Sequence, residues 1–117
     1  MKFEEAKQII KQKYNTRQDR LDVESILIDK HLKFATYYYI ILIKSENEAI
    51  LTDYAETCHI FYKLPLSVFE EVCKKHNIDF REGYIEKKFE SIEDVDNFVK
   101  VLDELSAKYA ELEEQED

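Results

Sequence analysis

One long apolar stretch decides the fold: residues 33–52, which read KFATYYYIILIK at 33–44, SENE at 45–48 and AILT at 49–52. The first part is rich in Tyr and Ile and is apolar on both faces, which predicts a central strand. Asn47 in the polar part tolerates a positive φ without glycine, so the chain can reverse there. The last part then returns as a second strand. We therefore expect an antiparallel hairpin inside a sheet.

The segments around this hairpin alternate between helix and strand patterns. Residues 3–15 carry apolar side chains at helical spacing and predict an amphipathic helix. Residues 23–29 alternate between their two faces and suit a short strand. Residues 57–62, which read TCHIFY, predict a further strand.

The second half of the chain contains clear helix boundaries. Pro65 stops the preceding segment, and Ser67 with Glu70 forms a capping box for a new helix. That helix is expected to end near His76, with Asn77 as its left-handed stop.

Two more strands are expected at 78–80 and 84–89, around the single glycine. Ser91 with Asp94 is an N-cap pattern for a last helix that reaches about residue 113. Apolar residues on this helix step by 3, 4, 3, 4 and 3, which defines a heptad seam: Val95, Phe98, Leu102, Leu105, Tyr109 and Leu112.

The seam also predicts how the last helix packs. Its first half is widened by Val99 and Val101, as expected where a helix lies on a sheet. Its second half is narrow, which favours helix-on-helix packing against residues 3–14 of the same chain. We therefore expect a monomer, because two copies of this acidic segment would repel, with an antiparallel homodimer as the alternative.

The order of elements predicts a single α+β domain over residues 1–117. It should contain a small, mostly antiparallel sheet of three to five strands with helices on one side, and an acidic C-terminal helix and tail at about 91–117. With one Gly and one Pro, the chain has no Gly-rich phosphate loop, dinucleotide fingerprint or nucleophile elbow. No cofactor is predicted, and the chain is expected to be non-enzymatic.

Cysteine usage and hydropathy bear on the compartment. Two cysteines, Cys58 and Cys73, are too few for a disulfide framework, and residues 1–5 contain no apolar signal core. The longest apolar run, residues 37–43, is far shorter than a membrane span. A cytoplasmic protein with no membrane contact is expected.

Charge is distributed unevenly along the chain. The net charge is −9 overall, +3 in residues 1–44 and −12 in residues 45–117. Residues 90–117 hold eleven acids and only Lys100 and Lys108. A nucleic-acid binder needs a basic footprint, so no direct nucleic-acid contact is expected.

An acidic helix of this kind favours a protein-binding module. A row of carboxylates on a rigid helix can imitate DNA phosphates and steer the capture of a basic, nucleic-acid-handling protein. The alternative is that the acidic surface only keeps a small protein soluble. The residues that would bind the partner are Glu90, Glu93, Asp94, Asp96, Asp103, Glu104, Glu111, Glu113 and Glu114.

One segment resembles a known family. Residues 28–31 (IDKH), the aromatic strand at 37–43 and residues 50–57 (ILTDYAET) are similar to the bacterial and prophage family called domain of unknown function 1828. Ala55 stands where that family favours Gly, and Tyr54 where it favours a second acid. The resemblance covers roughly residues 25–110 and implies a small α+β domain found in mobile elements, with no established activity.

Two metal-site hypotheses remain open at this stage. Cys58, His59, Cys73 and His76 are formally the ligand set of a structural zinc site, although adjacent strand residues point to opposite faces. The other is a metal-dependent, nuclease-like hydrolase: Asp53 and Glu86 would hold a divalent cation, and Lys88 would activate the attacking water.

Two further features have simple interpretations. His31 near Asp29 lacks an adjacent nucleophile and is interpreted as a loop residue. The Tyr37-Tyr38-Tyr39 run could stack on single-stranded nucleic acid, but it lacks interleaved basic residues and is better explained by packing.

Overall fold

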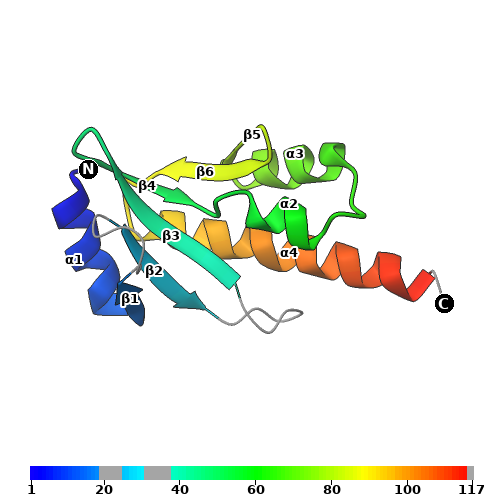
Figure 1. Ribbon diagram of the computed structural model, residues 1–117, viewed down its shortest axis with the longest axis horizontal. Coiled ribbons are helices and arrows are strands. Elements are labelled where there is room, and N and C mark those ends of the chain that lie inside the picture. The colour runs from blue at the N-terminus through cyan, green and yellow to red at the C-terminus, as the bar shows by residue number, and fades with distance from the viewer. Residues whose placement is uncertain (19–24, 31–37, 116–117) are drawn as a thin grey trace.

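The computed structural model describes residues 1–18, 25–30 and 38–115. Figure 1 shows these residues as an antiparallel sheet crossed by a long C-terminal helix. In chain order the elements are α1 (Phe3–Lys13), β1 (Thr16–Gln18), β2 (Ser25–Lys30), β3 (Tyr38–Ser45), β4 (Glu48–Thr52), α2 (Glu56–Ile60), α3 (Leu66–Lys75), β5 (Asp79–Arg81), β6 (Tyr84–Lys88) and α4 (Glu93–Gln115).

The strands form one sheet in the order β1-β2-β3-β4-β6-β5, and every neighbouring pair is antiparallel. β3 and β4 form the expected hairpin, with Leu42 opposite Leu51. Glu46 and Asn47 turn the chain with φ values of 51° and 77°. The predicted α+β class is confirmed. The described sheet has six strands rather than three to five, because Thr16–Gln18 adds an unexpected edge strand to β2.

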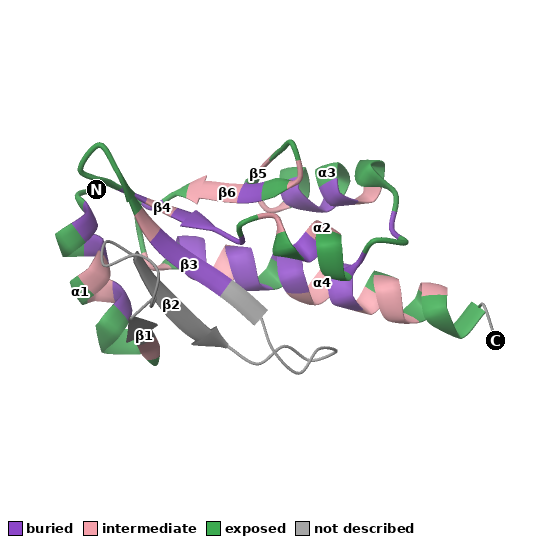
Figure 2. Ribbon diagram, in the orientation of Figure 1, coloured by how far each residue is buried: buried purple, intermediate pink, exposed green. Residues whose placement is uncertain are grey.

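All helices of the core lie on one face of the sheet, as expected. Leu42, Leu51 and Ile85 share this face by their register and are fully buried. Figure 2 shows buried turns in the part of α4 that lies beside the sheet and exposed turns toward its C-terminal end. Buried side chains from the helices join the same apolar cluster: Phe3, Ala6 and Ile10 of α1, Phe69, Val72 and Cys73 of α3, and Val95, Phe98, Val99, Val101, Leu102 and Leu105 of α4.

The heptad seam of α4 divides into two parts. Its first four residues, from Val95 to Leu105, are completely buried, whereas Tyr109 and Leu112 are only partly buried. The helix continues to Gln115 and runs along the longest dimension of the molecule, 46 Å. Its C-terminal turns extend beyond the sheet (Figure 1). This end of α4 is therefore the most outlying part of the described chain.

The prediction that residues 3–14 pack against the second half of the seam is wrong. The helix α1 lies at the opposite end of the molecule, where Tyr14 contacts Asp96 near the start of α4. The second half of α4 instead packs beside α2 and α3, with the Tyr109 ring 5.1 Å from the Phe61 ring. Spacing identifies which residues of a helix are buried, but it does not identify what covers them.

The strand expected at residues 57–62 is also wrong, because residues 56–60 form the short helix α2. The carboxylate of Asp53 accepts a hydrogen bond from the Thr57 backbone N–H at 3.1 Å and so caps this turn. The chain reaches the turn through Tyr54 and Ala55, whose φ values are 52° and 64°. A buried side chain outside the segment thus overrides the local strand preference.

The boundaries of α3 were predicted only in part. The helix begins at Leu66 with Pro65 as its N-cap, and no side chain makes the capping hydrogen bond, so the Ser67–Glu70 capping box is wrong. Pro65 already has the extended backbone that a helix N-cap requires, so the helix starts two residues earlier than expected. Asn77 is the left-handed stop that was expected, with a φ of 59°.

Some expectations fall on residues outside the described part of the chain. These are the start of the strand at 33–44 and the first residues of the strand at 23–29; the described strands begin at Tyr38 and Ser25. Among the described residues, no helix has the length and apolarity that crossing a membrane requires.

We predict that Asp94→Ala destabilises the fold by about 1 kcal/mol, the usual cost of losing a helix N-terminal cap. The Asp94 carboxylate is buried and accepts hydrogen bonds from the backbone N–H groups of Glu90 (2.6 Å) and Ser91 (3.0 Å). Urea unfolding measures the change. Glu93→Ala, one residue earlier and exposed, is the control; an equal loss in both variants would contradict a capping role.

Candidate protein-binding surface

The nine carboxylates expected to meet a partner do not form one continuous surface. Several are used inside the molecule, mainly in the first half of α4. Asp94 is the buried cap just described, and Asp96 accepts hydrogen bonds from Tyr14 Oη and, at 3.0 Å, from Lys13 Nζ. Glu104 pairs with Lys75 at 2.6 Å. These carboxylates stabilise the fold and are poor candidates for partner contacts.

The remaining acids lie mostly at the ends of α4. Glu90, paired with Lys87 at 3.5 Å, and Glu93 are exposed around its start, and Asp103 is half-buried in its middle. The last turns carry three exposed carboxylates, Glu111, Glu113 and Glu114. We call these three the distal acids.

The charge state of the paired carboxylates reflects their partners. The hydrogen bond from Tyr14, assisted by Lys13, lowers the pKa of Asp96 against the opposing effect of burial. The Lys75 hydrogen bond likewise lowers the pKa of Glu104, and the His76 imidazole lies 3.8 Å from the same carboxylate. Both groups therefore hold their negative charge more firmly in the folded chain than in the unfolded chain.

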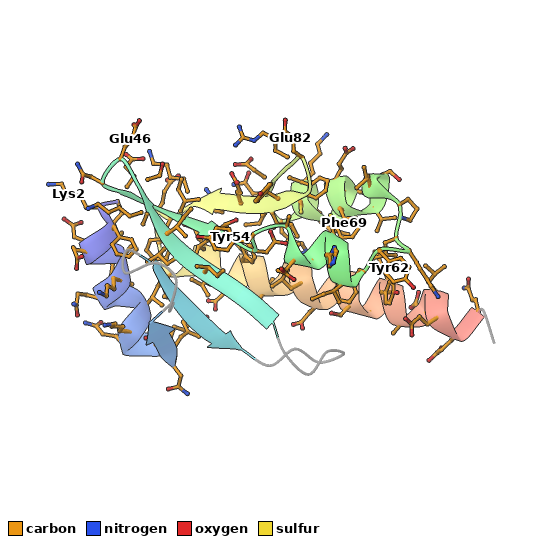
Figure 3. The ribbon with its side chains drawn as sticks, in the orientation of Figure 1. Lys2, Glu46, Tyr54, Tyr62, Phe69 and Glu82 are labelled. Atoms are coloured by element: carbon orange, nitrogen blue, oxygen red, sulfur yellow. The ribbon has the colours of Figure 1, made fainter. Side chains whose placement is uncertain are left out.

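An apolar patch lies beside the distal acids and was not found from the sequence. Ile60 at the end of α2, Tyr62 in the connection that follows and Leu66 at the start of α3 expose 42%, 70% and 62% of their surfaces. The Tyr62 ring lies 6.4 Å from the Tyr109 ring of α4 (Figure 3). We call these three residues the apolar patch. The only sequence signal was the density of apolar residues at 60–66, which does not show which of them point outward.

A groove of about 520 Å³ runs between α3 and α4. Its charges are mixed and partly neutralised within the chain, since Lys75 already pairs with Glu104. The groove therefore has no strong preference for ligands of one charge. Its lining residues are Glu71, Val72, Lys75, Glu104, Ala107, Lys108 and Glu111.

The three residues of the nuclease-like hypothesis do not converge. Asp53 is fully buried and directs its carboxylate into the fold, where it accepts hydrogen bonds from the backbone N–H groups of Ala55 (2.9 Å), Thr57 and Ile85 (3.0 Å). Glu86 of β6 pairs with Thr52 of β4 in the strand register, and both lie on the face of the sheet opposite to Leu51 and Ile85. Lys88 forms an ion pair with Glu48 at 3.0 Å. Asp53 is thus a structural carboxylate with its acceptor positions occupied.

The four residues of the zinc hypothesis are not gathered either. Burial, helped by the charge of Asp53, raises the pKa of the Cys58 thiol to about 11 and that of the Cys73 thiol to about 12. His76 faces Glu104 instead. Within the part of the chain that the structure describes, no three His, Cys, Asp or Glu side chains lie together as metal ligands would.

His31 and Tyr37 lie outside the described residues, as do the side chains of Asp29, Tyr38 and Tyr39. Comparison with known proteins adds no relative: no family model, no curated protein and no solved structure matches this chain. The candidate surface is therefore defined by geometry and charge alone.

We predict that Asp53→Asn lowers the free energy of unfolding by about 2–3 kcal/mol, because the amide leaves one buried N–H without an acceptor. Thermal or urea unfolding measures this loss. Glu86→Gln is the matched control: its carboxylate only makes a partly exposed contact with Arg81 at 3.7 Å, so about 0.5 kcal/mol or less is expected. Equal losses would contradict the structural role of Asp53.

We also predict a pH dependence from Asp96 and Glu104. Their pKa values are lowered by folding, so their stabilising contribution is complete above the unfolded-state values of about 4 and is lost as pH falls through the lower, folded-state values. The double variant Asp96→Asn, Glu104→Gln should therefore lose less stability than the wild type between about pH 6 and pH 3. Urea unfolding across this range measures the difference; parallel profiles would contradict it.

Proposed function

We propose that this chain is a non-enzymatic, acidic protein-binding module that presents the C-terminal end of α4 to a basic surface of another protein. The observation that supports the proposal is the charge at the end of this helix. The carbonyl end of a helix carries partial negative charge, which favours Lys or Arg in the last turn. α1 ends with Lys11 and Lys13, whereas the described last turn of α4 contains no basic residue.

The distal acids therefore act against the stability of their own helix. α3 follows the same rule as α1 and ends with Lys74 and Lys75. A local rule of this kind is broken mainly at functional sites. Glu111 and Glu114 are exposed, and the helix dipole adds to the negative potential they create. Such a potential would speed association with a basic partner.

The proposal has a narrower form. Carboxylates on a rigid helix can stand in for DNA phosphates, so the partner would be a nucleic-acid-handling protein that this chain inhibits. The resemblance of residues 25–110 to domain of unknown function 1828 favours a mobile-element origin for such an inhibitor. The described helix supports this form by being rigid: its first half is buried against the sheet, and Tyr109 packs on Phe61.

The test is capture of partners from a bacterial lysate on the immobilised protein, with the variant Glu111→Lys, Glu114→Lys. The wild type should retain a basic protein at low salt and release it at high salt, because exposed charges are screened. The variant should bind about tenfold more weakly. Added double-stranded DNA should displace the partner if the carboxylates imitate phosphates.

The control variant is Glu46→Lys, Glu82→Lys. It makes the same change in net charge at two exposed turns away from the distal acids, as Figure 3 shows. If both variants weaken capture equally, the effect is one of net charge, and the acidic surface serves solubility only. If DNA fails to displace the partner, the phosphate-mimic form is wrong while the binding module stands.

A further inference from the structure

The apolar patch is unusual for a surface of this size. Of the five large apolar side chains exposed in the described residues, three lie between residues 60 and 66, and Tyr62 and Leu66 are the most exposed of all. Single exposed apolar residues are common and need no explanation. A concentration of them on one segment typically marks an interaction site.

The backbone beneath the patch is held in place. Phe61 and Leu64 alternate with the patch residues and are buried in the core. The Leu64 N–H donates to the Phe61 carbonyl at 3.1 Å, and the Phe61 N–H donates to the Thr57 carbonyl at 2.9 Å. The patch is therefore presented in a fixed arrangement, so a partner would lose little binding energy to ordering it.

Tyr62 connects the patch to the distal acids through Tyr109 and Glu113. Tyr62 lies beside Tyr109, and the Tyr109 hydroxyl hydrogen-bonds to Glu113 one turn further along α4. Lys63 Nζ lies 6.0 Å from the Tyr62 ring centroid and is the nearby basic group on this segment. At these contacts, an apolar surface meets a region in which the three carboxylates of Glu111, Glu113 and Glu114 outnumber the Lys63 cation.

We infer that the apolar patch and the distal acids form one docking surface, and that its occupant is a basic amphipathic helix of another protein. Apolar residues of that helix would contact Tyr62 and Leu66, and its flanking Lys or Arg residues would meet the distal acids. This inference rests on the proposed function and specifies its partner. Charge complementarity selects the partner, because an acidic or neutral apolar helix would leave the carboxylates unmatched.

Two other occupants fit the charge less well. A second copy of this chain would bring its own distal acids to the same interface, which opposes association. A phospholipid surface is commonly anionic and would be repelled in the same way. Strand addition is also unsuited, since the edges of the described sheet are β1 and β5 rather than this segment.

The experiment uses two synthetic peptides of Lys and Leu, each about five turns long when helical. One places Leu on a single helix face; the other has the same composition in scrambled order. Fluorescence anisotropy measures their affinity for the full chain at low salt. The wild type should bind the amphipathic peptide at least about tenfold more tightly than the scrambled one, as expected for buried apolar anchors.

The variant Tyr62→Ser, Leu66→Ser should remove this preference and leave weak, salt-sensitive binding to both peptides. Both side chains are mostly exposed, so the fold should survive, which circular dichroism checks. Tyr84→Ser, a change at a 40% exposed tyrosine elsewhere, is the control and should bind as the wild type does. Glu111→Lys with Glu114→Lys should weaken binding of both peptides.

The possible failures are distinguishable. If the wild type binds both peptides equally and the charge variant weakens both, the docking surface is wrong while the acidic module stands. If neither peptide binds, the proposed function fails as well. A wild-type preference that survives Tyr62→Ser, Leu66→Ser would overturn the inference. So would a homodimer in sedimentation equilibrium that this double variant dissociates, because the patch would then be covered by a second copy.

Discussion

The structure depends on one buried carboxylate. Asp53 directly follows β4 and accepts hydrogen bonds from the backbone of the following turn, of α2 and, 32 residues away, of Ile85 in β6. A buried carboxylate without such partners would be strongly unfavourable. Its requirement for donors keeps the turn closed, although Tyr54 and Ala55 must adopt positive φ values there. The start of α2, the inward position of Phe61 and the support for the second half of α4 all follow from this arrangement.

Charge pairing along α4 divides the helix into a structural and a presented part. Near its start, Asp94 accepts hydrogen bonds from the backbone of residues 90–91. Asp96 accepts a hydrogen bond from Lys13 of α1. In the middle, Glu104 is committed to α3. Beyond that point the helix extends past the sheet, and Glu111 and Glu114 are exposed. The same sequence bias toward acids therefore produces internal contacts at one end and an outward negative potential at the other.

The sequence predicts what depends on periodicity and misses what depends on tertiary contacts. The β3–β4 hairpin is a long apolar stretch and the α4 seam is periodic over many residues, and the described residues contain both. Residues 57–62 are too few for a period to distinguish strand from helix. Their conformation depends on Asp53. The hydrogen bond that Asp53 accepts from the Ile85 backbone joins residues 32 positions apart, so a single sequence does not reveal it. For the same reason, the acids on α4 were identified as charged residues but not sorted into paired and exposed ones.

The apolar patch was missed for a related reason, and it changes how the surface would work. The run at 60–66 alternates inward and outward residues only because Phe61 and Leu64 are anchored below. Exposed carboxylates alone accelerate encounter, but they add little affinity in salt. Apolar anchors beside them supply affinity that salt does not screen. In the docking surface that we propose, charge would therefore speed the encounter with the partner, and Tyr62 and Leu66 would supply affinity that salt does not screen.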